Sequence, residues 1–366
     1  MGKHGTWACE TILLPTIIAA VGLALAEGAT RDAAIVVIPL IALAASPASS
    51  PYPASEAIKT VEWAPLAMVV RKGCGSDNWP IAWADDGNLY TAYGDGWGFD
   101  PKVDTKLSLG FAKIHGGPED FKGVNIRSET GERLGQGEAG PKASGMLCAN
   151  GVMYMLVRNA GNSQIVWSDD HGVTWRWCDW KFETSFGAPT FLNFGRNYAG
   201  KRDDFVYVYS HDSDSAYSPA DRMVLARVPL DRIRDRKAYE FLQSVDVAGR
   251  PEWTADIRCR GAVFVNPGRC FRSGITYNAG LKRYLWCQIL PFSTDPRGPR
   301  FQGGFGIYEA PEPWGPWRTA FYTEQWDTGP GETSTFPAKW MSDDGRTCCL
   351  LFSGDDCFSV RRATFR

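Results

Sequence analysis

The sequence predicts an all-β domain, a five-bladed β-propeller, preceded by an N-terminal signal or membrane-anchor segment. From about residue 60 to the end of the 366-residue chain, short runs of Val, Ile, Tyr, Phe and Trp alternate with Gly, Asp and Asn turns. Five segments in this region read as first strands of successive units. Helical periodicity is nearly absent, and one short helix is expected within 229–242, "PLDRIRDRKAYEFL".

The five first strands set the blade count. They lie within the segments 79–94, 142–157, 187–195, 270–290 and 334–352. Four run through a short turn into a second strand, and the third reaches its second strand through a longer loop. Proline interrupts three of them, at Pro80, Pro189 and Pro337. Because proline cannot donate to a strand ladder, it favours an edge strand, and the innermost strand of a propeller blade is such an edge. A β-sandwich or two smaller β domains are the alternatives.

The turn "SDDHGVTW", Ser168 to Trp175, matches the Asp-box pattern of propeller blades. We expect Asp170 to accept hydrogen bonds from backbone amides and Gly172 to supply a permissive φ. Trp175 is expected to pack between blades. This motif is a folding device, and it does not by itself indicate a sialidase.

The N-terminus carries two apolar runs that resemble signal-peptide cores. They are "TILLPTIIAAVGLALA" and "AAIVVIPLIALAA", and both are shorter than a typical membrane span. We expect 1–46 to be a signal peptide or membrane anchor, 47–60 a linker, and 61–366 the propeller. The protein is therefore expected to be secreted or periplasmic, with a membrane hairpin, an early start codon or two buried helices as alternatives for the doubled run.

Composition excludes several function classes. The formal net charge of −2 gives no basic field for nucleic acid. The ten cysteines form no CxxC pair and histidine occurs four times, so neither a metal site nor another cofactor is predicted, although a structural calcium ion stays open. In an exported chain some cysteines are expected to pair, but the sequence does not say which. We expect a monomer that binds a polysaccharide or oligosaccharide.

Residues 77–99, "DNWPIAWADDGNLYTAYGDGWGF", place a carboxylate at each open end of a predicted hairpin. An Asp-Gly turn centred on Asp86 pairs residues whose numbers sum to 172, so Asp77 is expected directly opposite Asp95. Opposed like charges about 5 Å apart destabilise a sheet but suit catalysis. One carboxyl group then keeps a proton while the other stays ionised, which are the two roles that glycoside hydrolysis needs. A turn cap or a calcium ligand is the structural alternative.

Other strand ends are expected to share this mouth of the channel. The candidates for substrate binding are Trp97, Lys142, Ser144, Glu183, His211, Asp212, Arg272 and Glu332. Glu332 is also the substitute acid if Asp95 points away. Trp79 and Tyr277 are weaker candidates for sugar stacking.

Three functions follow from these residues. The first is an exported glycoside hydrolase that uses Asp77 and Asp95. The second is a carbohydrate-binding or surface-interaction propeller without chemistry. The third is a polysaccharide lyase with His211 as its base.

Several segments together resemble a known family. They are "SDNWPIAWADDGNLYTAYGDGWGF", "GAPTFLNFGRNYAG", "VYVYSHDSDSAY", "MVLARVPLDRIRDRKAYEFL", "YNAGLKRYLW", "GIYEAPEPWGPW" and "FSVRRATF". Over roughly residues 65 to 366 the chain is similar to secreted bacterial five-bladed propellers long catalogued as a domain of unknown function, which include the endo-D-arabinanases. The resemblance implies a glycoside hydrolase with an acidic pair at the channel mouth, at Asp77 and Asp95 by motif position, and an arabinan-type substrate.

Overall fold

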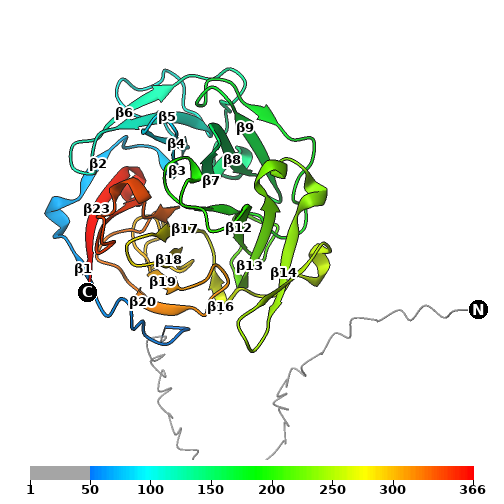
Figure 1. Cartoon of the computed structure of the whole chain (residues 1–366). Helices are drawn as coiled ribbons and strands as arrows, with labels where there is room; N and C mark the ends of the chain where they lie inside the picture. Colours follow the sequence, from blue (N-terminus) through cyan, green and yellow to red (C-terminus); the bar gives the residue numbers. More distant parts are fainter. Residues whose placement is uncertain (1–49) are drawn as a thin grey trace, which may run out of the picture. The chain divides into compact units, whose positions relative to one another are not determined.

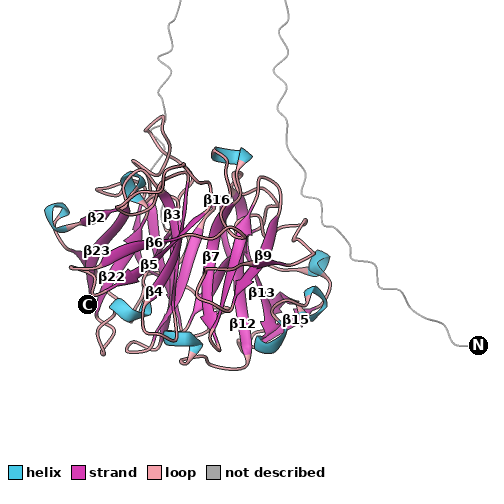
Figure 2. Cartoon of the chain, turned by 90° about the horizontal axis from the view of Figure 1, so that it is seen from above, coloured by secondary structure: helices cyan, strands magenta, loops and turns pink. Residues whose placement is uncertain are grey.

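The computed structural model describes residues 50–366, and this part of the chain is all-β, as the sequence predicts. The predicted signal or anchor segment, 1–46, lies outside the described residues. Antiparallel sheets follow one another around a central axis (Figure 1). Figure 2 shows the strands lying side by side between two ends that carry the loops.

The described residues form four hydrogen-bonded sheets. One sheet contains β3 (Asp77–Trp83), β4 (Leu89–Gly94), β5 (Gly110–His115) and β6 (Lys122–Ile126). The next contains β7 (Lys142–Ala149), β8 (Val152–Arg158), β9 (Ser163–Ser168) and β10 (Arg176–Trp177).

The largest sheet has ten strands in two antiparallel groups. The first group contains β11 (Thr190–Asn193), β12 (Phe205–His211), β13 (Ala220–Pro229), β14 (Glu240–Val245), β15 (Pro251–Thr254) and β16 (Phe264–Cys270). The second contains β17 (Ser273–Asn278), β18 (Arg283–Ile289), β19 (Phe305–Ala310) and β20 (Arg318–Thr323). Parallel pairing of β11 with β17 joins the two groups.

The remaining sheet joins the two ends of the described chain. It contains β21 (Ser334–Thr335), β22 (Thr347–Phe352) and β23 (Phe358–Phe365), with β1 (Val61–Trp63) and β2 (Val70–Lys72) both paired to β23.

The helical elements of residues 50–366 are single 3₁₀ turns. They are η1 (Leu66–Met68), η2 (Gly137–Ala139), η3 (Arg196–Tyr198), η4 (Leu230–Arg232), η5 (Arg236–Ala238), η6 (Ile257–Cys259), η7 (Ala338–Trp340) and η8 (Gly354–Asp356). Across this part of the chain, no helix reaches the length and hydropathy of a membrane span. The predicted helix in 229–242 is wrong: it is two such turns, because Ile233 is buried between them and β14 already begins at Glu240.

Five strands line one narrow cavity along the axis. They are β3, β7, β11, β17 and β21, which contribute Ile81, Ser144, Thr190, Ile275 and Thr335. These are the strands predicted to come first in each unit. The cavity measures about 20 Å³, room for one or two waters, so a sugar ring cannot enter it.

The prolines do not all lie within these strands. Pro80 is inside β3, which is the edge of its sheet, as predicted. Pro189 directly precedes β11, and Pro337 precedes η7 after β21 has ended. The prediction of a proline within the third and fifth first strands is therefore wrong, because the missing N–H places those two prolines just outside the ladder.

Hydrophobic cores fill the space between successive sheets. Trp175, from the turn after β9, is buried and stacks on Phe111 of β5 with 5.1 Å between ring centroids. In the same turn Asp170 Oδ1 accepts a hydrogen bond from the Thr174 amide at 2.8 Å, and Gly172 has φ +91°. A polar turn thus fixes an aromatic ring between two sheets.

The β3–β4 hairpin keeps the predicted register only near its turn. Ile81, Ala82 and Trp83 face Thr91, Tyr90 and Leu89, and these pairs sum to 172. A β-bulge between Asn78 and Ile81 then shifts the register, so Asp77 pairs with Gly94. The predicted direct pairing of Asp77 with Asp95 is therefore wrong by one residue.

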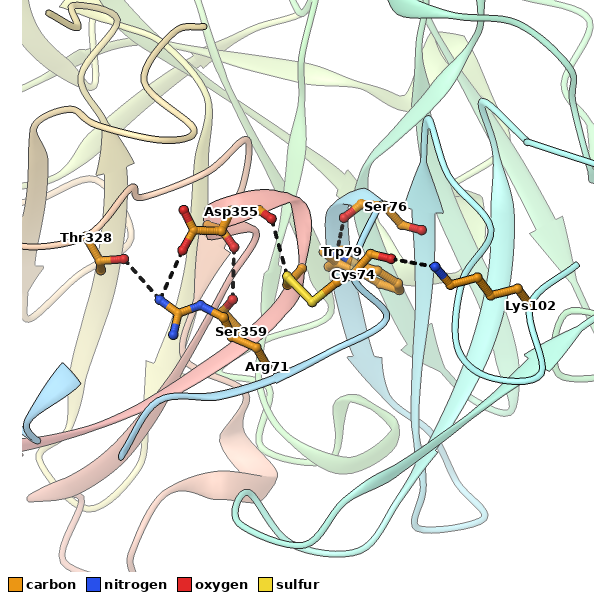
Figure 3. Close-up of a disulfide and its surroundings, with 10 residues drawn as sticks. Arg71, Cys74, Ser76, Trp79, Lys102, Thr328, Asp355 and Ser359 are labelled. Atoms are coloured by element: carbon orange, nitrogen blue, oxygen red, sulfur yellow. Dashed lines mark hydrogen bonds and ion pairs between the residues drawn. A yellow bond between two sulfur atoms is a disulfide. The ribbon is translucent and has the colours of Figure 1, made fainter. Parts of the chain in front are cut away.

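One disulfide links the two ends of the described chain, Cys74 to Cys357, with Cα atoms 4.0 Å apart (Figure 3). It closes the segment between β2 and β3 onto the segment between β22 and β23. The amides of Gly75 and Ser76 both donate to the Asp356 carbonyl, at 2.8 and 3.0 Å. The start of β3 is therefore held against η8, which brings Asp77 and Asp356 to the same end of the fold.

Candidate active site

Two glycines leave the space that the acidic end of the hairpin needs. Asp77 opens β3, and Asp95 directly follows β4. A Cβ atom at Gly94 would lie 2.6 Å from Asp77 Oδ1, closer than atoms approach without displacement. A Cβ atom at Gly96 would lie 2.0 Å from Ser76 Oγ, which accepts the amides of residues 97 and 98 at 3.0 Å. The glycines of "YGDGWG" are therefore needed for close packing around the acids.

The backbone that carries the two acids is strained. Asn78 has φ +69°, Trp79 +78° and Asp95 +41°, a region that non-glycine residues rarely occupy. Each such residue costs of order 1–3 kcal/mol and persists only where packing enforces it. The fully buried Trp79 ring packs between Phe99 and Phe358, 5.2 and 5.3 Å away, and enforces it here.

Asp77 is nearly buried, with 6% of its side chain exposed. The Asn78 side-chain amide donates to its Oδ1 at 2.6 Å, and a guanidinium nitrogen of Arg300 lies 3.7 Å from its Oδ2. Burial raises the pKa of Asp77, and the charge of Asp95 raises it further, while Arg158 opposes both. The environment of Asp77 therefore favours its protonated form.

Asp95 has the opposite environment. Lys142 Nζ lies 2.9 Å from its Oδ1, an ion pair whose angles do not make a hydrogen bond. The Gly137 amide donates to its Oδ2 at 2.9 Å. Lys142 is itself buried and donates to the carbonyls of Gly137 and Gly140, at 2.7 and 3.3 Å. A positive charge and an N–H group thus face the Asp95 carboxylate, while burial and the nearby charges of Asp95 and Asp356 disfavour ionisation of Asp77.

Glu332 lies between two arginines on the other side of Asp77. It forms an ion pair with Arg272 and lies 3.7 Å from Arg158. Both guanidinium groups lie over the ring of Tyr217, with 5.1 and 5.2 Å to its centroid. Arg158 also donates to Asn78 Oδ1 at 3.2 Å, which connects this group to the bulged strand.

The sequence missed four residues of this cluster: Arg158, Tyr217, Arg300 and Asp356. Arg158 is the last residue of β8, the second strand of its unit. Asp95 was selected because it lies at the end of a second strand, and the same criterion would have selected Arg158. Arg300 bridges Asp77 and Asp356 at 3.7 and 3.6 Å from a loop without any periodic pattern. Burial raises the pKa of Asp356 as well. Loop residues such as Arg300 and Tyr217 gave no sequence signal.

Several predicted residues do not join the cluster. Glu183 is exposed and makes no contact with the acids within residues 50–366. It lies in the loop before its unit's first strand, because β11 begins seven residues later, at Thr190. Asp212 instead binds Arg222 and Arg260, both at 2.7 Å; burial alone would raise its pKa, but these hydrogen bonds hold it below the ordinary value. Ser144 faces the narrow axial cavity and donates to the Leu156 carbonyl.

His211 is fully buried, with Nε2 2.8 Å from the Ser215 carbonyl oxygen. Burial lowers its pKa to about 4, so the ring is neutral at neutral pH. Neither direct substrate contact nor the lyase base role is favoured by this environment. The weaker stacking candidate Trp79 is likewise buried in the core. Trp97 remains partly exposed two residues beyond Asp95.

The cluster opens to solvent at one end of the fold. The side chains of Asp95, Glu332 and Arg300 are 11, 18 and 34% exposed. Among the described residues, no group of three or more His, Cys, Asp or Glu side chains is arranged to hold a metal ion. The groups available for chemistry here are a buried carboxyl group with a raised pKa, an ion-paired carboxylate and several guanidinium groups.

Comparisons with known proteins give distant structural similarities. No family model matches the chain, and no curated protein does either. A Bacteroides ovatus protein has 12% identity and a TM-score of 0.48 over 83% of this chain and 93% of its own. A GH43_1 enzyme from Xanthomonas citri has 16% identity and a TM-score of 0.42 over 84% and 91%. The exo-beta-1,3-galactanase of Phanerochaete chrysosporium has 9% identity and a TM-score of 0.44 over 81% and 63%. With each TM-score below 0.5, the site is assigned from its own geometry.

Proposed function

We propose that this protein is an exported glycoside hydrolase, a five-bladed β-propeller that cleaves a polysaccharide with Asp77 and Asp95. The observation that carries the proposal is the contrast between these neighbouring carboxyl groups. Asp77 is buried and has a raised pKa, whereas Asp95 faces the buried ammonium of Lys142. Adjacent acids with opposite environments divide the roles of proton donor and charged partner.

In this proposal Asp77 donates its proton to the glycosidic oxygen as the bond to the leaving sugar breaks. Asp95 stabilises the positive charge that develops at the anomeric carbon, a water molecule forms the new bond to that carbon, and the proton it releases restores the protonated carboxyl group. Lys142 and the Gly137 amide hold Asp95 in position. Because the axial cavity is too small for a sugar, the polymer lies across the end of the fold.

Two further features support the finer parts of the proposal. Dividing the ten-stranded sheet at its short parallel pairing leaves five groups of antiparallel strands, and the innermost strand of each group lines the cavity. The Cys74–Cys357 disulfide is typical of proteins from oxidising compartments, which favours export. Arabinan-type furanosides are the first substrates to test, because the sequence resembles the family that includes arabinanases.

The test is to incubate the protein with a panel of arabinan, xylan, galactan and acidic polysaccharides and to analyse the products. New reducing ends without ultraviolet-absorbing unsaturated sugars are expected from at least one polymer, and Asp77→Asn should remove them. Unsaturated products would identify a lyase. Glycan binding that survives in Asp77→Asn/Asp95→Asn, without cleavage by the wild type, would identify a binding protein.

A further inference from the structure

A basic cavity lies beside the acidic cluster, outside the groups used above. Its volume is about 550 Å³, and it lies between the segment that follows β2, the loop after Trp97 and the start of β6. The charged residues that line it are Arg71, Lys72, Lys102, Lys122 and Asp100. Four cations thus face one carboxylate, on a protein whose formal net charge is −2.

The positive charge of this cavity is only partly neutralised. Arg71 pairs with Asp355 at 3.2 Å, as Figure 3 shows. Within residues 50–366, no carboxylate lies within ion-pair distance of Lys72, Lys102 or Lys122. Lys102 donates to the Cys74 carbonyl at 3.2 Å (Figure 3). Lys72 donates to the Phe121 carbonyl at 2.5 Å, so two of the ammonium groups are held in place.

A row of cations connects the cavity with the acids. Lys102 and Lys106 both lie over the Trp97 ring, 5.8 and 5.6 Å from its centroid. Lys106 also hydrogen-bonds Gln136, the residue before the amide that binds Asp95. The partly exposed indole therefore lies between the acidic cluster and the basic cavity, with an ammonium group on each flank.

We propose that this surface, from Trp97 to the basic cavity, is an extended binding site for an acidic polysaccharide. The Trp97 ring positions Lys102 and Lys106 through cation–π contacts, and carboxylate or sulfate groups of neighbouring sugars bind Lys102, Lys106 and Lys122. Sugars with anionic substituents match this row of ammonium groups better than neutral sugars do. Cleavage of such a polymer rests on the function proposed above, but its binding does not.

Binding is measured in the Asp77→Asn background by isothermal titration calorimetry with two matched pairs of probes. Polygalacturonate is compared with its methyl ester, and dextran sulfate with dextran, so the members of each pair share a backbone and differ in their anionic groups. We expect both anionic polymers to bind more tightly than their neutral partners. A preference for one of them identifies the carboxylate or the sulfate as the natural group. Binding should weaken with added salt, because the cations are solvent-exposed.

The paired variant Lys102→Gln/Lys122→Gln should weaken anionic binding about tenfold, since two charge contacts are lost. Lys181→Gln/Lys237→Gln, at exposed sites on other loops, serves as the control and should bind like its parent. Equal binding by the two paired variants, or tighter binding of dextran than of dextran sulfate, would overturn the inference. Melting curves check that each variant is folded.

Hydrolysis separates this inference from the proposed function. If the anionic polymers bind but no polymer is cleaved, the binding site is supported and the proposed hydrolase activity is refuted. If only neutral polymers are cleaved, and Lys102→Gln/Lys122→Gln does not change that cleavage, the hydrolase activity is supported and the acidic substrate is refuted.

Discussion

The two ends of the β3–β4 hairpin each carry two aspartates, and Asp77 at the open end differs from the pair at the turn. At the turn, Asp86 accepts hydrogen bonds from the Asn88 amide and the Tyr90 hydroxyl and pairs with Lys113 at 2.8 Å. Burial opposes ionisation, but these donors outweigh it and hold the pKa of Asp86 below its ordinary value. Asp85 pairs with His171 at 2.7 Å. These acids stabilise a turn.

At the open end the same residue type lacks this support. Asp77 accepts one short hydrogen bond, is buried beside Asp95, and has a raised pKa. Its strand is bulged and its neighbours have positive φ. The number of donors and the burial around each carboxyl group account for the opposite directions of the two shifts: the pKa of Asp86 is lowered and that of Asp77 is raised.

The largest expected effect is on kcat, which should depend on the aspartates at the open end of the hairpin and not on Asp86 at the turn. Asp77→Asn and Asp95→Asn should each lower kcat about 10³-fold, because general acid catalysis and charge stabilisation are lost. Asp86→Asn, which removes only a turn contact, should leave kcat nearly unchanged. Steady-state kinetics on the cleaved polymer measure this. Similar losses in all three variants would show that the acids matter only for folding.

The next effect concerns the space opposite Asp77. Gly94→Ala places a methyl group within 2.6 Å of Asp77 Oδ1 and should displace the carboxyl group. Displacement by about 1 Å is expected to lower kcat about 10²-fold. Gly161→Ala is the control, because no atom lies within 4 Å of the added Cβ there. Full activity in Gly94→Ala would mean that the position of Asp77 is unimportant.

The pH profile provides a third contrast. Activity should fall as the pH rises through the raised pKa of Asp77, because the proton donor is lost. Asp356→Asn should shift this fall to lower pH, since the charge of Asp356 contributes to the raised pKa. Asp86→Asn should leave the profile in place. The pH dependence of kcat/KM in the three proteins shows whether the shift is specific to the open end.

The smallest effect is on stability, with opposite signs at the two ends. Asp77→Asn should raise the free energy of unfolding at neutral pH by about 1 kcal/mol, because it removes a carboxyl group whose ionisation is disfavoured by burial in the folded state. The folded pKa of Asp77 lies above 3.8, so the wild-type protein loses stability as the pH rises through the folded pKa. Below pH 3.8 the carboxyl group is protonated in both the folded and the unfolded state, so Asp77→Asn should no longer be more stable than the wild type.

Asp86→Asn should lower the free energy of unfolding by about 1 kcal/mol, because charge-assisted hydrogen bonds are lost. The folded pKa of Asp86 lies below 3.8, so its stabilisation is present above pH 3.8 and disappears as the pH falls through the folded pKa. Urea unfolding at several pH values tests both signs. Destabilisation by Asp77→Asn at neutral pH would contradict the assignment of strain to the open end.

The sequence was sufficient for features that depend on local pattern. The strands of all five first segments, the Asp-Gly turn and the proximity of Asp77 to Asp95 follow from alternation and turn chemistry. The bulge at Asn78–Trp79 did not, because it depends on Trp79 packing against Phe358, nearly 280 residues away. Burial of His211 and the arrival of Arg300 from a loop are equally non-local, so no spacing rule could place them.

The most direct measurement of the central claim is the pKa of Asp77, obtained by NMR titration of the ¹³C-labelled carboxyl group. In the wild type it should lie above the ordinary value of 3.8, and in Asp95→Asn it should move toward that value without reaching it, because burial remains. Asp86, followed in the same titration, should lie below 3.8 in both proteins. An Asp77 pKa at or below 3.8, or one unchanged by Asp95→Asn, would contradict the account.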